Sequence, residues 1–170
     1  MLHFTYCPVC GSPGFEPSSF KSRRCPSCGF ELFQNPSSSV AAFIRNDRGE
    51  LLLAVRGCEP MKGTLDLPGG FADKGETVEQ ALRREVMEET ALSVVGERYL
   101  FSLPNEYEYS GLIIPTLDMF FEVTVGDLSP LRPSDDVSSL VWMQPDEVNA
   151  DDIGLLSVRR AFLRYREMLK

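Results

Sequence analysis

The segment "TVEQALRREVMEET", Thr77–Thr90, has the pattern of an amphipathic helix that carries acidic side chains on its apolar side. Thr77 and Gln80 are spaced as a capping box, in which each side chain satisfies a free backbone N–H at the start of a helix. The helix should therefore begin near Val78. At about 100° per residue, one side of this helix forms an apolar stripe. Its members are Ala81, Leu82 and Val86.

Three glutamates stand in the last turns of this expected helix. Glu85 and Glu89 project into the apolar stripe, and Glu88 lies beside it. The helix dipole disfavours anions at this end. A carboxylate that faces a core costs several kcal/mol unless a cation compensates it. The position of these side chains therefore needs an explanation.

Three explanations are open. A solvated acidic face is the commonest role of a glutamate cluster, but solvated side chains should avoid the apolar stripe. Salt bridges to Arg83 or Arg84 could neutralise part of the charge, although two arginines can hardly serve all the nearby acids. These acids are Glu76, Glu79, Glu85, Glu88 and Glu89. A divalent metal fits better, and hard oxygen ligands favour magnesium or manganese over zinc.

The loop before the helix supports the metal hypothesis. Pro68, Gly69 and Gly70 predict a tight turn of the backbone. In such a turn the Gly70 carbonyl can face the same ions as the glutamates. We interpret the loop and helix as a scaffold for a polyphosphate that two or three divalent ions bridge.

On both sides of this unit, strand-like and helical patterns alternate. "VAAFIRNDRGELLLAVR" predicts a β-hairpin spanning Val40 to Arg56, whereas "DLPGGFADKGE" has the punctuation of a loop. Further strands are expected at "SVVGERYLFSL", "LIIPTLDMFFEVTV" and "SLVWMQ". A final amphipathic helix should run from about Leu155 to Leu169. Its apolar side would contain Leu155, Val158, Phe162, Tyr165 and Leu169. This order predicts an α/β fold, a sandwich whose mixed sheet is covered by helices.

Four of the five cysteines lie near the N-terminus, in "CPVC" and "CPSC". The spacing C-x2-C-x14-C-x2-C suits one tetrahedral zinc ion held by Cys7, Cys10, Cys25 and Cys28. Two disulfides in a secreted domain are the alternative, which the lack of a signal-like N-terminus disfavours. Residues 1 to about 35 contain little apolar material, so this small zinc ribbon would depend on its metal. "QNPSSS" predicts the linker to a second domain, residues 36–170, in which Cys58 is expected to be a small core residue.

Composition limits the classes of function. The chain has 170 residues, is 43% hydrophobic and carries a formal net charge of −8. That charge argues against a general nucleic-acid binder, because neutralising phosphates requires a basic surface. No apolar run approaches the roughly 20 residues of a membrane helix. We therefore expect a cytoplasmic protein with neither a membrane nor nucleic acid as its partner.

The loop and helix together resemble the Nudix box of nucleoside-diphosphate-X hydrolases. Gly70, five residues, Glu76, seven residues and then "REVMEETAL" follow the pattern of that box. Ala91 departs from it, because the family has glycine there. A left-handed helix end would cost alanine roughly 1 kcal/mol. The resemblance extends over residues 36–170 and implies a Nudix-type α/β/α sandwich.

The resemblance also implies site residues and an activity. Glu85 and Glu89 would be the principal metal ligands, helped by Glu88 and the Gly70 carbonyl. Glu76 and Arg84 would brace the loop against the helix. Asp136, six residues before Trp142, stands where related enzymes place a further acid, with Asp135 beside it. The activity implied is metal-dependent hydrolysis of the diphosphate of a nucleoside diphosphate-X, such as ADP-ribose or a dinucleotide, to a nucleoside monophosphate and phospho-X.

The cysteine module resembles the zinc-ribbon branch of the family, which includes NADH pyrophosphatases and ADP-ribose pyrophosphatase-like enzymes. NADH pyrophosphatases carry a Ser-Gln-Pro-Trp motif, whereas "FSLPNEYEYSG" here has neither the glutamine nor the tryptophan. NAD(H) specificity is therefore not supported. Tyr107 and Tyr109 could stack on a base, with ordinary strand packing as the alternative, and we also expect Arg56 to contact the substrate. The ribbon is expected to be structural and to help form a homodimer. The alternative function is a non-catalytic nucleotide sensor or nucleic-acid-binding regulator that uses the ribbon.

Overall fold

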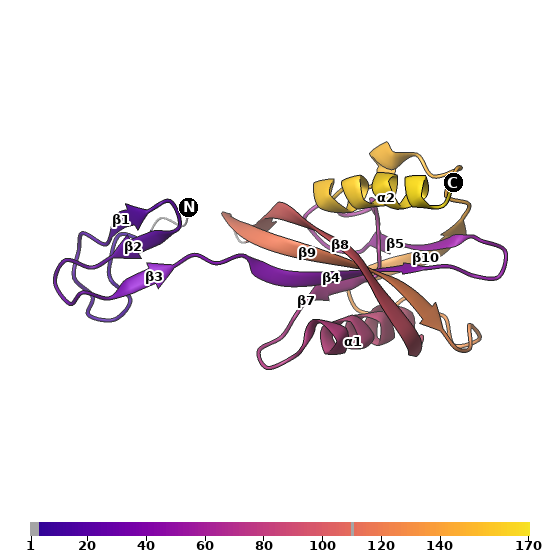
Figure 1. Cartoon of the computed structure of the whole chain (residues 1–170), viewed down its shortest axis with the longest axis horizontal. Helices are drawn as coiled ribbons and strands as arrows, with labels where there is room; N and C mark the ends of the chain where they lie inside the picture. The colour runs from indigo at the N-terminus through magenta and orange to yellow at the C-terminus, as the bar shows by residue number, and fades with distance from the viewer. Residues whose placement is uncertain (1–3, 110) are drawn as a thin grey trace. The chain divides into compact units, whose positions relative to one another are not determined.

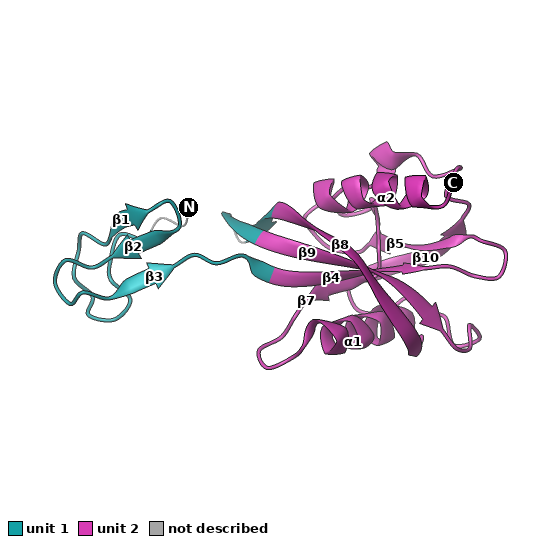
Figure 2. Ribbon diagram, in the orientation of Figure 1, with its two compact units in different colours: residues 1–37, 106–115 teal, residues 38–105, 116–170 magenta. Residues whose placement is uncertain are grey.

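The computed structural model describes residues 4–109 and 111–170, and its chain divides into two compact units (Figure 1, Figure 2). The cysteine unit comprises residues 1–37 and 106–115, and the sandwich unit comprises residues 38–105 and 116–170. The predicted domain boundary near residue 35 thus lies close to Ser37, where the first segment of the cysteine unit ends. The segment 106–115, which sequence patterns assigned to the second domain, groups with the cysteine unit. None of the helices in the described residues is long and apolar enough to cross a membrane.

The cysteine unit contains a small antiparallel sheet. Its strands are β1 (Glu16–Ser19), β2 (Ser22–Arg24) and β3 (Glu31–Phe33), in the order β1-β2-β3. Its core is small. Buried Cys7, Phe15 and Cys25 pack with Phe30 and Leu32. So little burial is consistent with a unit that needs a metal to fold.

The sandwich unit contains two sheets. One has the order β7-β4-β9-β8 and the other β10-β5-β6. The strands are β4 (Ser37–Ile44), β5 (Leu51–Arg56), β6 (Leu65–Asp66), β7 (Gly69–Phe71), β8 (Val94–Tyr109), β9 (Leu112–Val125) and β10 (Val137–Met143). The end of β8 and the start of β9, within residues 106–115, group with the cysteine unit. The helices are α1 (Val78–Thr90), the short 3-10 helix η1 (Ala150–Asp152) and α2 (Leu156–Met168).

Helices α1 and α2 cover opposite faces of the strands (Figure 1). The alternation of side chains along β4 explains why both faces need a cover. Phe43 belongs to the core that contains Phe162 and Tyr165 of α2. Its neighbours Ala42 and Ile44 belong to the core of α1. The predicted α/β sandwich is therefore confirmed.

The predicted hairpin from Val40 to Arg56 is wrong. Strands β4 and β5 are joined by a tight turn, but they belong to different sheets, and an isolated bridge between Arg45 and Leu51 links them at that turn. Each strand uses both edges on other partners, β4 on β7 and β9 and β5 on β6 and β10. Local spacing could not reveal these pairings, because β7, β9 and β10 come from further along the chain and β6, which follows β5, takes one of its edges.

Three other elements differ from their predicted bounds. The predicted loop "DLPGGFADKGE" contains the end of β6 and all of β7, because the glycine pair forms a ladder with β4. Strand β8 continues to Tyr109, beyond the predicted segment. In α2, Val158, Phe162 and Tyr165 are buried as predicted, but Leu169 follows the helix and is exposed.

Candidate functional site

Helix α1 begins and ends where its sequence predicts. The Thr77 hydroxyl accepts a hydrogen bond from the Gln80 backbone N–H at 3.2 Å, and the Gln80 side chain accepts one from the Thr77 N–H at 2.8 Å. This capping box sets the phase of the helix. As a result, Glu85 and Glu89 face inward and are only 9% and 8% exposed. Glu88 remains exposed beside them.

The glycine pair lets the backbone of β7 approach these carboxylates. Gly69 pairs with Ala41 of β4 at a φ of 153°, and a Cβ there would lie 2.1 Å from the Val40 carbonyl oxygen. A Cβ on Gly70 would lie 2.5 Å from Oε1 of Glu85. The Gly69 N–H donates to Oε2 of Glu89 at 2.9 Å. Glycine is therefore required at both positions, and β7 and α1 share one polar site.

Arg84 ties this site to the preceding loop. Its Nε and Nη2 donate to the two oxygens of Glu76 at 2.8 and 3.0 Å, and Nη2 also donates to the Phe71 carbonyl at 2.9 Å. Its Nη1 donates to Glu85 at 2.8 Å and to Glu88 at 3.0 Å. The hydrogen bonds from Arg84 lower the pKa of Glu76, and the same carboxylates raise the pKa of Arg84. The brace that the resemblance implied is thus present as a contact.

Burial shifts both inward-facing glutamates toward their protonated forms. Burial raises the pKa of Glu89 to about 8, against the hydrogen bond from Gly69, and the charges of Glu85, Asp66 and Asp135 raise it further. Burial also raises the pKa of Glu85, although Arg84 opposes that effect. Crowded carboxylates of this kind are stabilised by a cation with oxygen preference. The donor set therefore fits magnesium or manganese.

The two aspartates before β10 affect the pKa values of several neighbouring groups. Asp135 contributes to the raised pKa of both Glu85 and Glu89. Its segment is held against the end of α1, because the Ser134 N–H donates to the Glu89 carbonyl at 3.2 Å. Burial raises the pKa of Cys58, and the charges of Asp136 and Asp135 raise it further. The Asp136 carbonyl accepts a hydrogen bond from the Gly57 N–H. The charge of Asp135 thus acts on the helix glutamates, and the role of Asp136 at this site stays a prediction.

Asp66 is a buried acid that the sequence patterns did not single out. It is 8% exposed and forms an ion pair with Nη1 of Arg56 at 2.6 Å. Burial raises its pKa, and its charge contributes to that of Glu89. In the sequence, the position of Asp66 directly before the "LPGG" turn could have indicated that this acid lies near the site. Arg56, predicted to contact substrate, is engaged here by Asp66 and by the Pro60 carbonyl at 2.8 Å.

The predicted stacking residues lie near the end of β8, in the cysteine unit. Tyr109 is exposed, and Tyr107 is half-buried. Their contact with a nucleobase stays a prediction.

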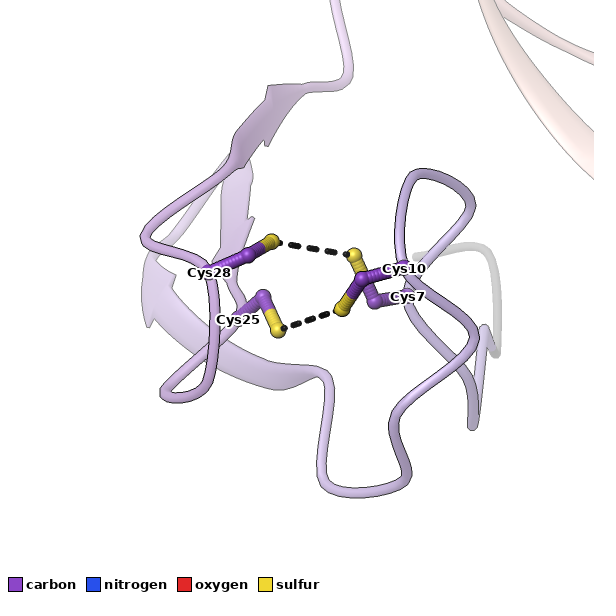
Figure 3. A group of neighbouring side chains, drawn as sticks. All are labelled: Cys7, Cys10, Cys25 and Cys28. Carbon is purple, nitrogen blue, oxygen red and sulfur yellow. Dashed lines mark hydrogen bonds between the residues drawn. The ribbon is translucent and has the colours of Figure 1, made fainter.

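The four N-terminal cysteines converge, with the two loops facing each other (Figure 3). Their sulfurs all lie within 4.8 Å of one another, and the Cys7–Cys28 and Cys10–Cys25 separations are both 3.7 Å. Tetrahedral zinc with bonds of about 2.3 Å spaces its sulfurs roughly 3.8 Å apart, whereas a disulfide is about 2.05 Å long. Hydrogen bonds with Ser12 lower the pKa of Cys10 to about 6, which favours a thiolate. The group therefore fits zinc rather than two disulfides.

Ala91 ends α1 in the left-handed conformation, with φ 60° and ψ 17°. Its N–H donates to the Met87 carbonyl, which closes the last turn. This geometry is the one that favours glycine. Ala91 therefore adopts the left-handed conformation expected of the family's glycine, and this conformation is less favourable for alanine than for glycine.

Comparisons with known proteins agree with this geometry. The NUDIX domain family model matches residues 35–164. An NAD-capped RNA hydrolase NudC of Deinococcus radiodurans is 31% identical over 128 residues, which cover 74% of this chain and 44% of the relative. An NAD-capped RNA hydrolase NudC of Stutzerimonas stutzeri is 27% identical over 160 residues, covering 94% of this chain and 53% of the relative. The chain thus spans about half the length of the curated relatives it matches.

The fold has similar solved structures. A NUDIX hydrolase from Nitrosomonas europaea superposes with a TM-score of 0.73 at 24% identity, covering 96% of this chain and 91% of that one. At this identity the likeness supports the fold alone. The family model, in contrast, covers the box residues of β7 and α1 and most of the chain. The chain belongs to the NUDIX domain family.

Proposed function

We propose that this protein is a metal-dependent hydrolase that cleaves the diphosphate of a nucleoside diphosphate-X. The products would be a nucleoside monophosphate and phospho-X. The observation that carries the proposal is the burial of Glu85 and Glu89 on α1, against the glycine backbone of β7. Two acids with raised pKa values at such a position are typical of a functional site.

Glu85, Glu89 and Glu88 would hold two or three magnesium or manganese ions, together with the Gly70 carbonyl. When bound, such ions neutralise the charge of a diphosphate and lower the pKa of a coordinated water toward about 7. Arg84 and Glu76 fix the loop before α1 through two hydrogen bonds. The Gly69 N–H holds the Glu89 carboxylate in place.

Asp135 is our candidate for the further acid of this site, as ligand or base. Its charge acts on Glu85 and Glu89, and its loop is hydrogen-bonded to the end of α1. We retain Asp136 as the second candidate because it is the adjacent residue. Asp135→Asn and Asp136→Asn distinguish the two, since the larger loss of kcat identifies the acid that acts at the site.

The identity of X is a matter for direct assay. Arg56, Tyr107 and Tyr109 are proposed to contact the substrate. The relatives are named for NAD-capped RNA, so a capped RNA belongs in the test although the chain carries a net negative charge. The panel should contain ADP-ribose, NAD(H), a dinucleoside polyphosphate, a nucleotide sugar and NAD-capped RNA.

Glu89→Gln is the decisive variant. We expect magnesium- or manganese-dependent release of a nucleoside monophosphate from at least one compound, and loss of that release in Glu89→Gln with the fold retained. Arg83→Gln is the matched control, because Arg83 lies on the same helix and pairs with Glu97 instead. Full turnover by Glu89→Gln would refute the ligand assignment. Tight binding of a nucleotide by the parent protein without turnover would favour the alternative function, a non-catalytic nucleotide sensor.

The cysteine unit is proposed to hold one structural zinc ion and to contribute to a homodimer. The convergence of the four sulfurs supports the zinc. We also propose a cytoplasmic location, in which thiols stay reduced and available to the metal. Zinc content per chain and the mass in solution test the first two proposals.

A further inference from the structure

Arg84 binds the same carboxylates that the proposed metal site requires. Its Nη1 lies 2.8 Å from Oε1 of Glu85 and 3.0 Å from Oε2 of Glu88. The Glu85 side chain is 11% exposed, and that of Arg84 is 26% exposed. Charge-assisted hydrogen bonds in such partly buried positions are stronger than those of a solvated pair.

The rest of the guanidinium is held elsewhere. Nε and Nη2 bind Glu76, and Nη2 also binds the Phe71 carbonyl. Because the group is planar, these contacts fix the direction in which Nη1 points. The contacts to Glu76 and Phe71 thus anchor the guanidinium. Nη1 cannot move away from Glu85 and Glu88 without disturbing those contacts.

We propose that Arg84 is an internal cation that competes with the divalent ion for Glu85 and Glu88. This inference rests on the proposed function, since it takes these glutamates as metal ligands. Metal binding would draw the carboxylates of Glu85 and Glu88 away from Nη1 into coordination, while Glu76 keeps the other side of the guanidinium. Arg84 would thus weaken metal affinity and set the metal concentration at which the site fills.

A purely orienting arginine would have the opposite effect. If Arg84 only held Glu85 in its coordinating position, its removal would leave a less ordered carboxylate and weaker metal binding. If Arg84 competes, its removal frees Glu85 and Glu88 and strengthens metal binding. The sign of the change in metal affinity therefore distinguishes the two roles.

The experiment is calorimetric titration of manganese into the 170-residue protein, dialysed free of magnesium and manganese with its zinc retained. We expect Arg84→Gln to bind at least one manganese ion about tenfold more tightly than the parent, the effect of releasing one charge-assisted hydrogen bond. Arg84→Lys should fall between the two, because an ammonium cannot bridge Glu85 and Glu88 while it is anchored at Glu76. If Arg84→Gln fails to fold, the manganese affinity of Arg84→Lys still gives the sign of the change.

Arg83→Gln is the control for net charge. It removes one positive charge from the same helix, but Arg83 binds Glu97 and the Val94 carbonyl rather than the box glutamates. Equal tightening in Arg83→Gln and Arg84→Gln would show an effect of net charge and overturn the competition. Weaker binding in both Arg84 variants would also overturn it. If the parent binds no manganese at this site, the proposed function itself fails.

Discussion

Replacing Glu89 by glutamine removes a carboxylate whose burial raises its pKa from an ordinary 4.5 to about 8. Between these two pKa values, the Glu89 carboxyl is protonated in the folded chain and ionised in the unfolded chain. The free energy of unfolding should therefore fall as the pH rises from about 5 to 8 in the presence of a chelator. With 1.36 kcal/mol for each pKa unit, the full effect is on the order of 4 kcal/mol at pH 8.

Glutamine cannot ionise, so Glu89→Gln should remove most of this decline. Its side-chain oxygen can still accept the Gly69 N–H, although its buried NH2 group costs about 1 kcal/mol or more. We expect the variant to be more stable than the parent by about 2 kcal/mol at pH 8 in chelator. Saturating magnesium should reverse the order, because the ion stabilises only a site that can bind it.

Urea unfolding at several pH values between 5 and 8, with chelator and with magnesium, measures both effects. Glu79→Gln is the control. Hydrogen bonds at the start of α1 lower the pKa of this exposed residue, so its contribution to stability is lost only as the pH falls toward 4 and below. An unchanged slope in Glu89→Gln between pH 5 and 8 would refute the assignment of Glu89 as a buried acid.

Three further predictions concern the fold. Ala91→Gly should raise the free energy of unfolding by about 0.5–1 kcal/mol, because it relieves the left-handed alanine at the end of α1. Ala81→Gly, on the buried side of the same helix, should lower the free energy of unfolding. If urea unfolding showed changes of the same sign in the two variants, this explanation would be contradicted. Asp118→Ala should cost about 3 kcal/mol, since it leaves four donors without their acceptor, and a loss below about 1 kcal/mol would be the contrary result. These donors are the side chains of Ser39, Asn105, Thr116 and Ser157. Cys25→Ser should abolish stoichiometric zinc and increase amide exchange in residues 4–37 while α1 and α2 stay protected.

The sequence by itself determined the elements whose signals are local. Helix α1 begins after the predicted capping box, and its periodicity placed Glu85 and Glu89 on the buried side. Strand β9 has its predicted bounds, because it is rich in apolar and β-branched residues and carries only two charged side chains, Asp118 and Glu122. The doubled cysteine pairs likewise predicted the four-sulfur group, since ligand spacing is itself local.

Only the tertiary structure decided which distant segments meet. The partners β7, β9 and β10 lie well beyond the turn at Asn46, so the apolar runs around it could not reveal that β4 and β5 belong to different sheets. The choice between Asp135 and Asp136 depends on how their loop packs against the end of α1. The pairing of Asp66 with Arg56 follows from the register of β5 and β6. Capping and periodicity act within a few residues, whereas sheet partners and charge contacts depend on packing across the whole unit.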